Sequence, residues 1–528
     1  MDIDLSFFAH SPAAQQWERI HIKPHHGLVI PLFSLHSAQS CGIGEFTDLL
    51  PIVDWCARLG FDVIQLLPLN DTGLDASPYN ALSAFALNPI HLGLSALPYL
   101  EQYPFLQEEL KIIPRRSQHH WVNYSQTREA KGRFLKHYYQ LTYQTFLEDP
   151  SYQDFLHRAT WLKGYAVFKT LKELHHWHCW EMWPLEFQNP TPELLQNISE
   201  QYADEVNGHC LLQYLCDQQL QHVKAQATAS KILLMGDIPI LISRDSTEVW
   251  LQRDLFDLTY SAGAPPDIYS EEGQNWGFPL YNWEKIAAHN YEWWTSRLNW
   301  ASQYYNVYRL DHIIGFFRIW AIPLGGKSKD GHFIPANSAT WIDHGQKILL
   351  IMLNHCNMLP IGEDLGIVST EIRSCLAALG ICGTKVMRWE RDWTNNDDFY
   401  PPNLYPLASM TTVSTHDSET LQLWWQNNPA DARAFADFKG WCYHPRLSRA
   451  NHWEILWDSH HSNSLFRINL LQEYLALIPG LTWPNLELER INQPGLELSS
   501  NWSYCFKPSV EEIIQNSTLA HLLKTIIL

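Results

Sequence analysis

The chain has 528 residues, of which 46% are hydrophobic and 13% are aromatic, and its formal net charge at pH 7 is −19. This composition excludes a disordered chain, which would be rich in charge and poor in aromatic side chains. The negative charge argues against binding to nucleic acid or to a membrane surface, and no apolar run approaches the ~20 residues that span a bilayer. Because no secretory signal is visible near the N-terminus, we expect a cytoplasmic protein.

Short apolar runs rich in β-branched residues recur along the chain, and each ends in polar or charged residues. Runs of this kind are typical of buried parallel strands. Apolar residues at helical spacing follow several of them, as at Leu49, Val53 and Cys56. The predicted strands, in chain order, are residues 27–35, 62–69, 231–240, 306–311, 358–364, 383–389 and 410–417.

Alternation of strands and helices indicates an α/β fold, either an open doubly wound sheet or a closed eight-stranded barrel. Glu363 and Asp417 lie 54 positions apart, close to two barrel units of about 31 residues each. We therefore predict a single catalytic TIM (β/α)8 barrel over residues 1–528. Residues 70–230 show helical spacing without strand-like runs, which predicts a largely helical insertion between strands 2 and 3. Residues 244–304 are predicted to form a second insertion, between strands 3 and 4, that borders the active site.

Four acidic residues stand at the carboxyl ends of predicted strands: Asp237, Asp311, Glu363 and Asp417. In a parallel barrel these ends converge on one face, where the active sites of this fold lie. A carboxylate in an apolar strand costs several kcal/mol unless it is hydrogen-bonded or lies at the open mouth. Any one of these acids alone would be read as a helix cap or a turn residue. The four together predict an acidic pocket.

Arg309 and His416 are sequence neighbours of two of these acids. Arg309 precedes Asp311 by two residues on the same predicted strand, so both side chains point the same way and the guanidinium keeps the carboxylate ionised. His416 adjoins Asp417 and can donate hydrogen bonds to a hydroxylated substrate. Two carboxyl groups on neighbouring strands suit cleavage of a glycosidic bond with retention, in which one attacks the anomeric carbon and the other protonates the leaving oxygen.

Metal-binding and nucleotide-binding alternatives have weaker signals in the sequence. A divalent metal cluster needs no adjacent arginine, and the chain lacks the His pairs that are usual for zinc or iron. His175 and His178 share a predicted helix face, but no acidic or cysteine partner follows at a recognisable spacing. The G-x-G sequence at 42–44 lacks the third glycine of a dinucleotide fingerprint. We therefore predict neither a metal nor a cofactor.

Three motifs contain the acidic residues: YRLDHIIG (308–315), GEDLG (362–366) and STHD (414–417). They resemble the conserved regions of the α-amylase superfamily in the form carried by amylomaltases. These are the 4-α-glucanotransferases, or disproportionating enzymes, of glycoside-hydrolase family seventy-seven. The resemblance covers about residues 27–505 and extends to GIGEF (42–46), GDIPI (236–240), GQNWG (273–277), THDSETLQLWW (415–425) and INQPG (491–495).

The resemblance implies a role for each acid: Asp311 as nucleophile, Glu363 as general acid/base and Asp417 as the third carboxylate, which binds sugar hydroxyls in the transition state. The implied reaction moves a segment of an α-1,4-glucan to the 4-hydroxyl of an acceptor glucose or glucan, through a covalent glycosyl-enzyme. Its implied partners are α-1,4-glucans and maltooligosaccharides, with a role in maltooligosaccharide, glycogen or starch metabolism. The positions that match the family's substrate-binding residues are Arg309, His416, Asp237, Tyr79, Trp276, Gln274 and Ser77.

The chain departs from the family pattern at Phe278, Arg244, Ser503 and Cys505. From these departures we expect differences in acceptor preference and product size rather than in reaction type. A hydrolase of the same superfamily is one alternative, although the blocks at 262–277 and 415–425 resemble those of transferases. A catalytically inactive glycan-binding protein is another, but such a protein tolerates loss of a carboxylate, and all three are present.

Overall fold

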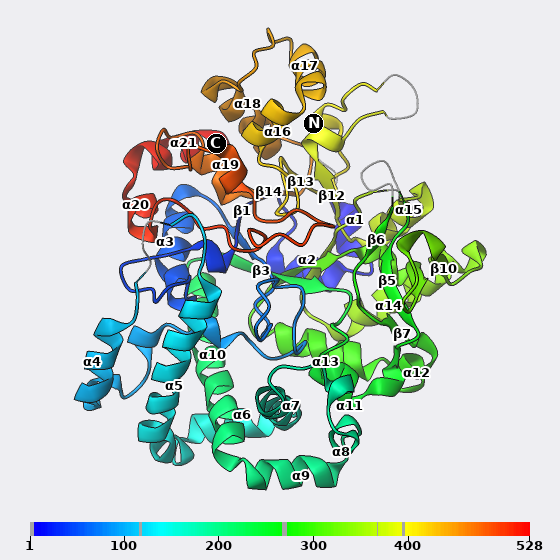
Figure 1. Ribbon diagram of the computed structural model, residues 1–528. Helices are drawn as coiled ribbons and strands as arrows, with labels where there is room; N and C mark the ends of the chain where they lie inside the picture. The colour runs from blue at the N-terminus through cyan, green and yellow to red at the C-terminus, as the bar shows by residue number, and fades with distance from the viewer. Residues whose placement is uncertain (1–4, 116–118, 267–271, 367, 393–396) are drawn as a thin grey trace.

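The computed structural model describes residues 5–115, 119–266, 272–366, 368–392 and 397–528. Eight parallel strands form a barrel in sequence order, and helices surround it (Figure 1). Most residues of these strands are buried, as is typical of parallel strands in a barrel. The strands are β1 (His25–Ile30), β2 (Val63–Leu66), β3 (Leu233–Pro239), β8 (Val307–Asp311), β11 (Leu359–Gly362), β12 (Gly383–Val386), β13 (Ser409–Thr412) and β14 (Phe466–Leu470).

Hydrogen bonds close this sheet on itself. β1 pairs in parallel with both β2 and β14, and a parallel bridge between Ile361 and Cys382 joins β11 to the residue just before β12. The backbone N–H of Gly362 donates to the carbonyl oxygen of Cys382 over 2.7 Å. The predicted TIM barrel is therefore confirmed, and the open doubly wound sheet is not what the chain forms.

The eighth strand, β14, has no counterpart among the seven predicted strands. Its sequence, FRINL, places Arg467 and Asn469 inside an apolar run, which hides the strand from a hydrophobicity pattern. Both polar side chains have partners in the fold: Arg467 donates to the carbonyl oxygen of His460, and the fully buried Asn469 accepts from the backbone N–H of Val413.

The seventh predicted strand, 410–417, ends earlier than expected. β13 stops at Thr412, whose hydroxyl donates to the carbonyl oxygen of Ser414, and Val413 donates to a side chain instead of a neighbouring strand. His416 and Asp417 therefore lie in the loop that follows the strand, at the carboxyl end of the barrel.

Helices of 4 to 27 residues fill the interval between β2 and β3. In Figure 1 they gather to the left of the strands and below them, in cyan to green. Several have side-chain caps, as where Asn123 accepts from the backbone N–H of Gln126 at the start of α5. These helices are α4 (Pro104–Ile112), α5 (Tyr124–Leu147), α6 (Pro150–Arg158), α7 (Leu162–Leu174), α8 (Leu185–Gln188), α9 (Pro192–Gln201) and α10 (Ala203–Ala229).

Between β3 and β8 the chain forms short strands and helices. β5 and β6 join the later β9 (Ile319–Pro323) and β10 (His332–Ile334) in an antiparallel sheet of order β10-β9-β5-β6, while β4 pairs with β7. The elements of this interval are α11 (Thr247–Leu251), β4 (Phe256–Asp257), β5 (Tyr260–Ala264), β6 (Gln274–Asn275), β7 (Leu280–Tyr281), α12 (Trp283–Ala288) and α13 (Glu292–Ala301).

Of the remaining helices, two precede β1, one lies between β1 and β2, and the others follow β8 along the chain. No helix in the part of the chain that the structure describes is long and apolar enough to cross a membrane. The helices are α1 (Ser6–His10), α2 (Ala14–Ile20), α3 (Leu49–Leu59), α14 (Trp341–His355), α15 (Thr370–Leu379), α16 (Leu421–Asn427), α17 (Pro429–Phe438), α18 (Arg449–His460), α19 (Leu471–Leu475), α20 (Val510–Gln515) and α21 (Ser517–Ile527).

Candidate active site

The four predicted acids lie at the carboxyl ends of four barrel strands. Asp237 is near the end of β3, Asp311 is the last residue of β8, Glu363 follows β11, and Asp417 lies in the loop after β13. Because β3, β8 and β11 are neighbours in the sheet, the first three carboxylates share one side of the barrel mouth.

Arg309 connects two of these acids. Its Nη1 atom lies 3.0 Å from both carboxylate oxygens of Asp237 and 2.7 Å from Oδ1 of Asp311. The Asp237 side chain is fully buried, whereas that of Asp311 is 28% exposed. Burial raises the pKa of Asp237 even though Arg309 opposes this effect. Arg309 therefore fixes one oxygen of Asp311, and of these two carboxylates only that of Asp311 is accessible to solvent.

Glu363 is held by two backbone N–H groups. His312 donates to Oε2 over 2.8 Å, and Leu365 donates to Oε1 over 3.1 Å. His312 has a φ of 52°, in the left-handed region that residues other than glycine rarely adopt, directly after Asp311. Burial, with a further contribution from the charge of Asp311, raises the pKa of Glu363 to about 7, although Arg309 and the two N–H groups act in the opposite direction. A carboxyl group of this kind can both give and take a proton near neutral pH.

Asp417 is the centre of a second hydrogen-bonded group. His416 Nε2 lies 3.1 Å from its Oδ2, and the side-chain amide of Asn492 donates to Oδ1 over 2.7 Å. Burial alone would raise the pKa of Asp417, but His416 and Asn492 outweigh it and hold the pKa at about 2. Tyr79 links the two groups, since its hydroxyl donates to Asp237 over 2.7 Å and lies 3.0 Å from His416 Nε2.

Aromatic side chains pack against two residues that adjoin the acids, His416 and His312. Tyr79 stacks on His416 with ring centroids 5.5 Å apart, and Trp502 lies 5.4 Å from Tyr79. Trp276 packs edge-on against His312, the residue after Asp311, with ring centroids 4.8 Å apart. Such faces suit the flat C–H surfaces of sugar rings.

The two predicted polar residues Gln274 and Ser77 have different partners: Gln274 contacts Trp276, and Ser77 contacts the backbone of Tyr79. Gln274 accepts a hydrogen bond from the indole N–H of Trp276 over 3.0 Å, so it belongs to the aromatic side of the mouth. Gly263 permits this strand to approach, since a Cβ atom there would lie 2.0 Å from the carbonyl oxygen of Gln274. Ser77 instead shapes the turn before Tyr79, whose backbone N–H donates to the Ser77 hydroxyl over 3.4 Å. Residues 267–271 of the predicted block 262–277 lie outside the described residues.

The residues that depart from the family pattern have partners of their own. Arg244 pairs with Glu181, and its pKa is raised by hydrogen bonds to that carboxylate. The remaining three make hydrogen bonds to other parts of the chain: the carbonyl of Phe278 accepts from the backbone N–H of Ala262, Ser503 donates to the carbonyl of Ser500, and the Cys505 thiol donates to that of Ser34.

Three residues of the site were not among those singled out from the sequence: Asn492, His312 and Trp502. Asn492 lies in the INQPG sequence and His312 in YRLDHIIG, so a signal for these two segments existed. Their contacts could not be predicted, because Asn492 is 75 positions from the carboxylate that it binds. His312 acts through its backbone N–H, which no side-chain pattern reveals. Within the described ranges, no group of three His, Cys, Asp or Glu side chains could hold a metal ion.

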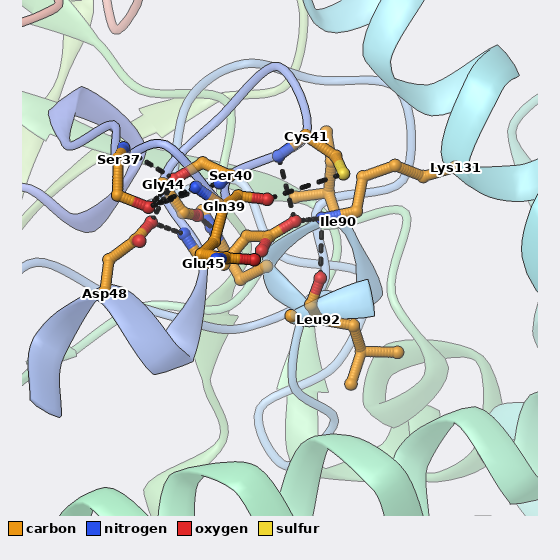
Figure 2. Close-up of polar contacts among 12 residues, drawn as sticks. Ser37, Gln39, Ser40, Cys41, Gly44, Glu45, Asp48, Ile90, Leu92 and Lys131 are labelled. Atoms are coloured by element: carbon orange, nitrogen blue, oxygen red, sulfur yellow. Dashed lines mark hydrogen bonds and ion pairs between the residues drawn. The ribbon is translucent and has the colours of Figure 1, made fainter. Parts of the chain in front are cut away.

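A buried polar cluster supports the loop after β1 (Figure 2). The ammonium group of Lys131, on α5, lies 2.8 Å from Glu45 Oε1 and donates to the carbonyl oxygen of Leu92 over 2.6 Å. Asp48 accepts from the hydroxyl of Ser40 over 2.6 Å and from the backbone N–H of Glu45 over 2.7 Å. Burial raises the pKa of Glu45 and that of Asp48. The cluster therefore fixes helix α5 against the barrel.

The same helix holds two segments that carry site residues. The hydroxyl of Tyr124 donates to the carbonyl oxygen of Trp502 over 2.8 Å. The Arg128 guanidinium donates to the two carbonyl oxygens of residues 74–75, each over 2.6 Å, just before the turn that presents Tyr79. Helix α5 thus positions both aromatic rings that pack near His416.

Replacing Lys131 with methionine should lower the free energy of unfolding by about 3–5 kcal/mol, because Glu45 would be left as an uncompensated buried charge. Chemical denaturation measures this loss, with Lys136→Met on the exposed face of α5 as the control. Since Glu45 can take up a proton in the variant, the loss should be smaller at about pH 5 than at about pH 8. An equal effect of both substitutions would show that the pair does not anchor the helix.

Comparison with known proteins assigns the family. The family model described as 4-alpha-glucanotransferase matches residues 30–510. The 4-alpha-glucanotransferase of Chlamydia pneumoniae is 46% identical over 511 residues, which is 96% of each chain, and that of Chlamydia caviae is 44% identical over 509 residues, covering 96% of this chain and 94% of its own. Among solved structures, the amylomaltase from Streptococcus agalactiae in complex with acarbose superposes with a TM-score of 0.82 at 25% identity, over 96% of this chain and 98% of its own. The chain therefore belongs to the 4-alpha-glucanotransferase family of enzymes, glycoside-hydrolase family seventy-seven, as its motifs predict.

Proposed function

We propose that the protein transfers a segment of an α-1,4-glucan from a donor to the 4-hydroxyl of an acceptor glucose or glucan, with retention at the anomeric carbon. The observation that carries this proposal is that Asp311, held by Arg309, and Glu363, whose pKa is raised to about 7, lie at the carboxyl ends of the paired strands β8 and β11. Membership of the family supports transfer over hydrolysis. The same likeness supports a role in maltooligosaccharide, glycogen or starch metabolism.

In the first step, Asp311 attacks the anomeric carbon and Glu363 gives its proton to the leaving glycosidic oxygen. Arg309 holds Oδ1 of Asp311, so Oδ2 is the oxygen that we expect to attack. The bond from the anomeric carbon to the leaving oxygen breaks as the bond to Asp311 forms. The product is a β-glucosyl ester of Asp311 and a shortened glucan.

In the second step, the ionised Glu363 takes the proton of the acceptor 4-hydroxyl, which attacks the ester. The switch from acid to base follows from charge: the negative charge of Asp311 helps to raise the pKa of Glu363, and this charge is lost once Asp311 is glycosylated. Asp417, kept ionised by His416 and Asn492, binds sugar hydroxyls in both transition states.

The aromatic and polar residues around the mouth bind the sugar rings in this proposal. Tyr79 lies beside Asp237 and His416, Trp276 lies beside His312, and Gln274 lies beside Trp276. Segment 244–304 thereby borders the active site through β6. Ser77 acts through the turn that holds Tyr79.

Incubation with maltotriose tests the reaction type. A transferase should release glucose and also build a ladder of maltooligosaccharides longer than the substrate. Chromatography of the products at early times measures both. Glucose and maltose alone would identify a hydrolase and contradict the proposal.

The pH dependence should reveal Glu363 as the acid. Because its pKa is raised to about 7, the proton is retained to higher pH than in an ordinary carboxyl group. For maltotriose, kcat/KM should fall about tenfold per pH unit above pH ~7, as the acid ionises. α-Maltotriosyl fluoride, whose leaving group needs little protonation, should form the glycosyl-enzyme without this alkaline limb. If the rate fell in the same way above pH ~7 with both donors, a group other than Glu363 would be responsible for the fall.

A further inference from the structure

We propose that Glu473, in helix α19, is a positioning residue that holds the loop 413–421 so that His416 and Asp417 face the reacting sugar. This inference rests on the proposed function, which gives Asp417 its place in the transition state. Glu473 comes three residues after the end of β14, at the same end of the barrel as the four acids, and its side chain is fully buried.

Two donors from the loop meet one oxygen of Glu473. Its Oε1 atom accepts a hydrogen bond from the hydroxyl of Ser414 over 2.5 Å and one from the backbone N–H of Leu421 over 2.9 Å. A third bond joins Val413 to Asn469, the second-last residue of β14, over 2.9 Å. Since these donors lie before and after His416 and Asp417, β14 and α19 fix the loop at both of its ends.

The second oxygen of Glu473 faces a buried histidine. Oε2 lies 3.3 Å from Nε2 of His452, on α18, and the His452 side chain is also fully buried. Burial by itself would raise the pKa of Glu473, but His452, the Ser414 hydroxyl and the Leu421 N–H outweigh it and lower the pKa. A stable core does not require such a pair, because apolar residues of similar volume stabilise proteins at least as well. An ionised Glu473 is instead a strong hydrogen-bond acceptor, which suits it to bind Ser414 and Leu421 of the loop.

The same helix supports the other partner of Asp417. Gln472 donates to the carbonyl oxygen of Glu489 over 2.6 Å, three residues before Asn492. The backbone N–H of Asn492 donates to the carbonyl of His416 over 3.1 Å, while its side chain binds Asp417. Helix α19 therefore sets the position of Asp417 and of the amide that orients it.

Ser414→Ala removes one donor with minimal change of volume, and we expect kcat for maltotriose disproportionation to fall about tenfold, or ~1.4 kcal/mol in barrier height. KM should change less than about twofold, because the lost alignment matters in the transition state. Ser11→Ala is the matched control: Ser11 is buried and donates to the carbonyl of Phe8. This control should lower Tm at most and leave kcat unchanged.

Two further measurements separate positioning from stability alone. Glu473→Gln keeps an acceptor oxygen for Ser414 and Leu421, so kcat should stay within about threefold of wild type, whereas Glu473→Leu should lose at least as much as Ser414→Ala. In an Asp417→Asn background, Ser414→Ala should cause no further loss of kcat, since it acts through Asp417. If Glu473→Leu does not fold, the kcat of Ser414→Ala, alone and in the Asp417→Asn background, still tests the inference.

Wild-type kcat in Ser414→Ala, with only Tm lowered, would overturn the inference while leaving the proposed reaction intact. A full tenfold loss that persists in the Asp417→Asn background would also overturn it. High activity of Asp417→Asn itself would instead refute the role proposed for Asp417, and the inference with it.

Discussion

Replacing Asp311 with asparagine should reduce the rate of glucan transfer by about three orders of magnitude or more, equivalent to a barrier increase of at least ~4 kcal/mol. The amide oxygen of asparagine can still accept the hydrogen bond from Arg309, so the shape of the site should survive. What the variant lacks is the negative charge that attacks the anomeric carbon. Initial rates with maltotriose measure the loss, and Tm checks that the fold is retained.

Asp62→Asn serves as the matched control for this experiment. Asp62 precedes β2, at the opposite end of the barrel from the acids, and it also pairs with a cation, since Lys23 Nζ lies 2.7 Å from its carboxylate. Its replacement should leave kcat unchanged. If Asp311→Asn retained more than about a tenth of wild-type activity, a loss under ~1.4 kcal/mol, the nucleophile would have to be another residue.

The strands and the acids at their ends were predictable because each depends on local sequence. A buried parallel strand needs a short apolar run, and a charged residue directly after such a run points to the open end of the barrel. For Arg309 and Asp311, the spacing of two residues on one strand places both side chains on the same face, and their contact at 2.7 Å agrees with this.

Other parts of the site depend on contacts that no local pattern contains. β14 was missed because Arg467 and Asn469 interrupt its apolar run. Asn469 is nevertheless buried, and its side-chain oxygen accepts a hydrogen bond from the backbone N–H of Val413 in the loop after β13. The link from Tyr79 to His416 joins residues 337 positions apart. Family resemblance marked Tyr79 and His416, but only the packing of the barrel shows which of their atoms meet.

The helices between β2 and β3 likewise combine features that local sequence predicts with contacts that it does not. Its helices follow from apolar spacing, but nothing in that spacing shows that α5 carries three different anchors. Tyr124, Arg128 and Lys131 lie at helical intervals on one face and bind the Trp502 segment, the Tyr79 turn and Glu45. Helix α5 therefore has a direct physical connection to the site, through the segments that it holds.

Glu363→Gln should separate the two halves of the reaction. The variant keeps the nucleophile Asp311 but has no proton to give to the leaving oxygen, so turnover of an ordinary glucan should nearly cease. Glutamine also has only one acceptor oxygen for the two backbone N–H groups of His312 and Leu365, which should cost about 1–3 kcal/mol of stability. Tm should therefore be measured first, to show that the variant is folded at the assay temperature.

With α-maltotriosyl fluoride, whose departure needs little protonation, Asp311 should still be glycosylated in this variant. The ester should then accumulate, because no base remains to take the proton of an incoming 4-hydroxyl. Mass spectrometry of the quenched protein should show one added maltotriosyl unit, on the peptide that contains Asp311, while Asp311→Asn carrying Glu363→Gln should show none. Labelling of the peptides that contain Glu363 or Asp417 would reverse the assigned roles, since the trapped sugar marks the residue that attacks.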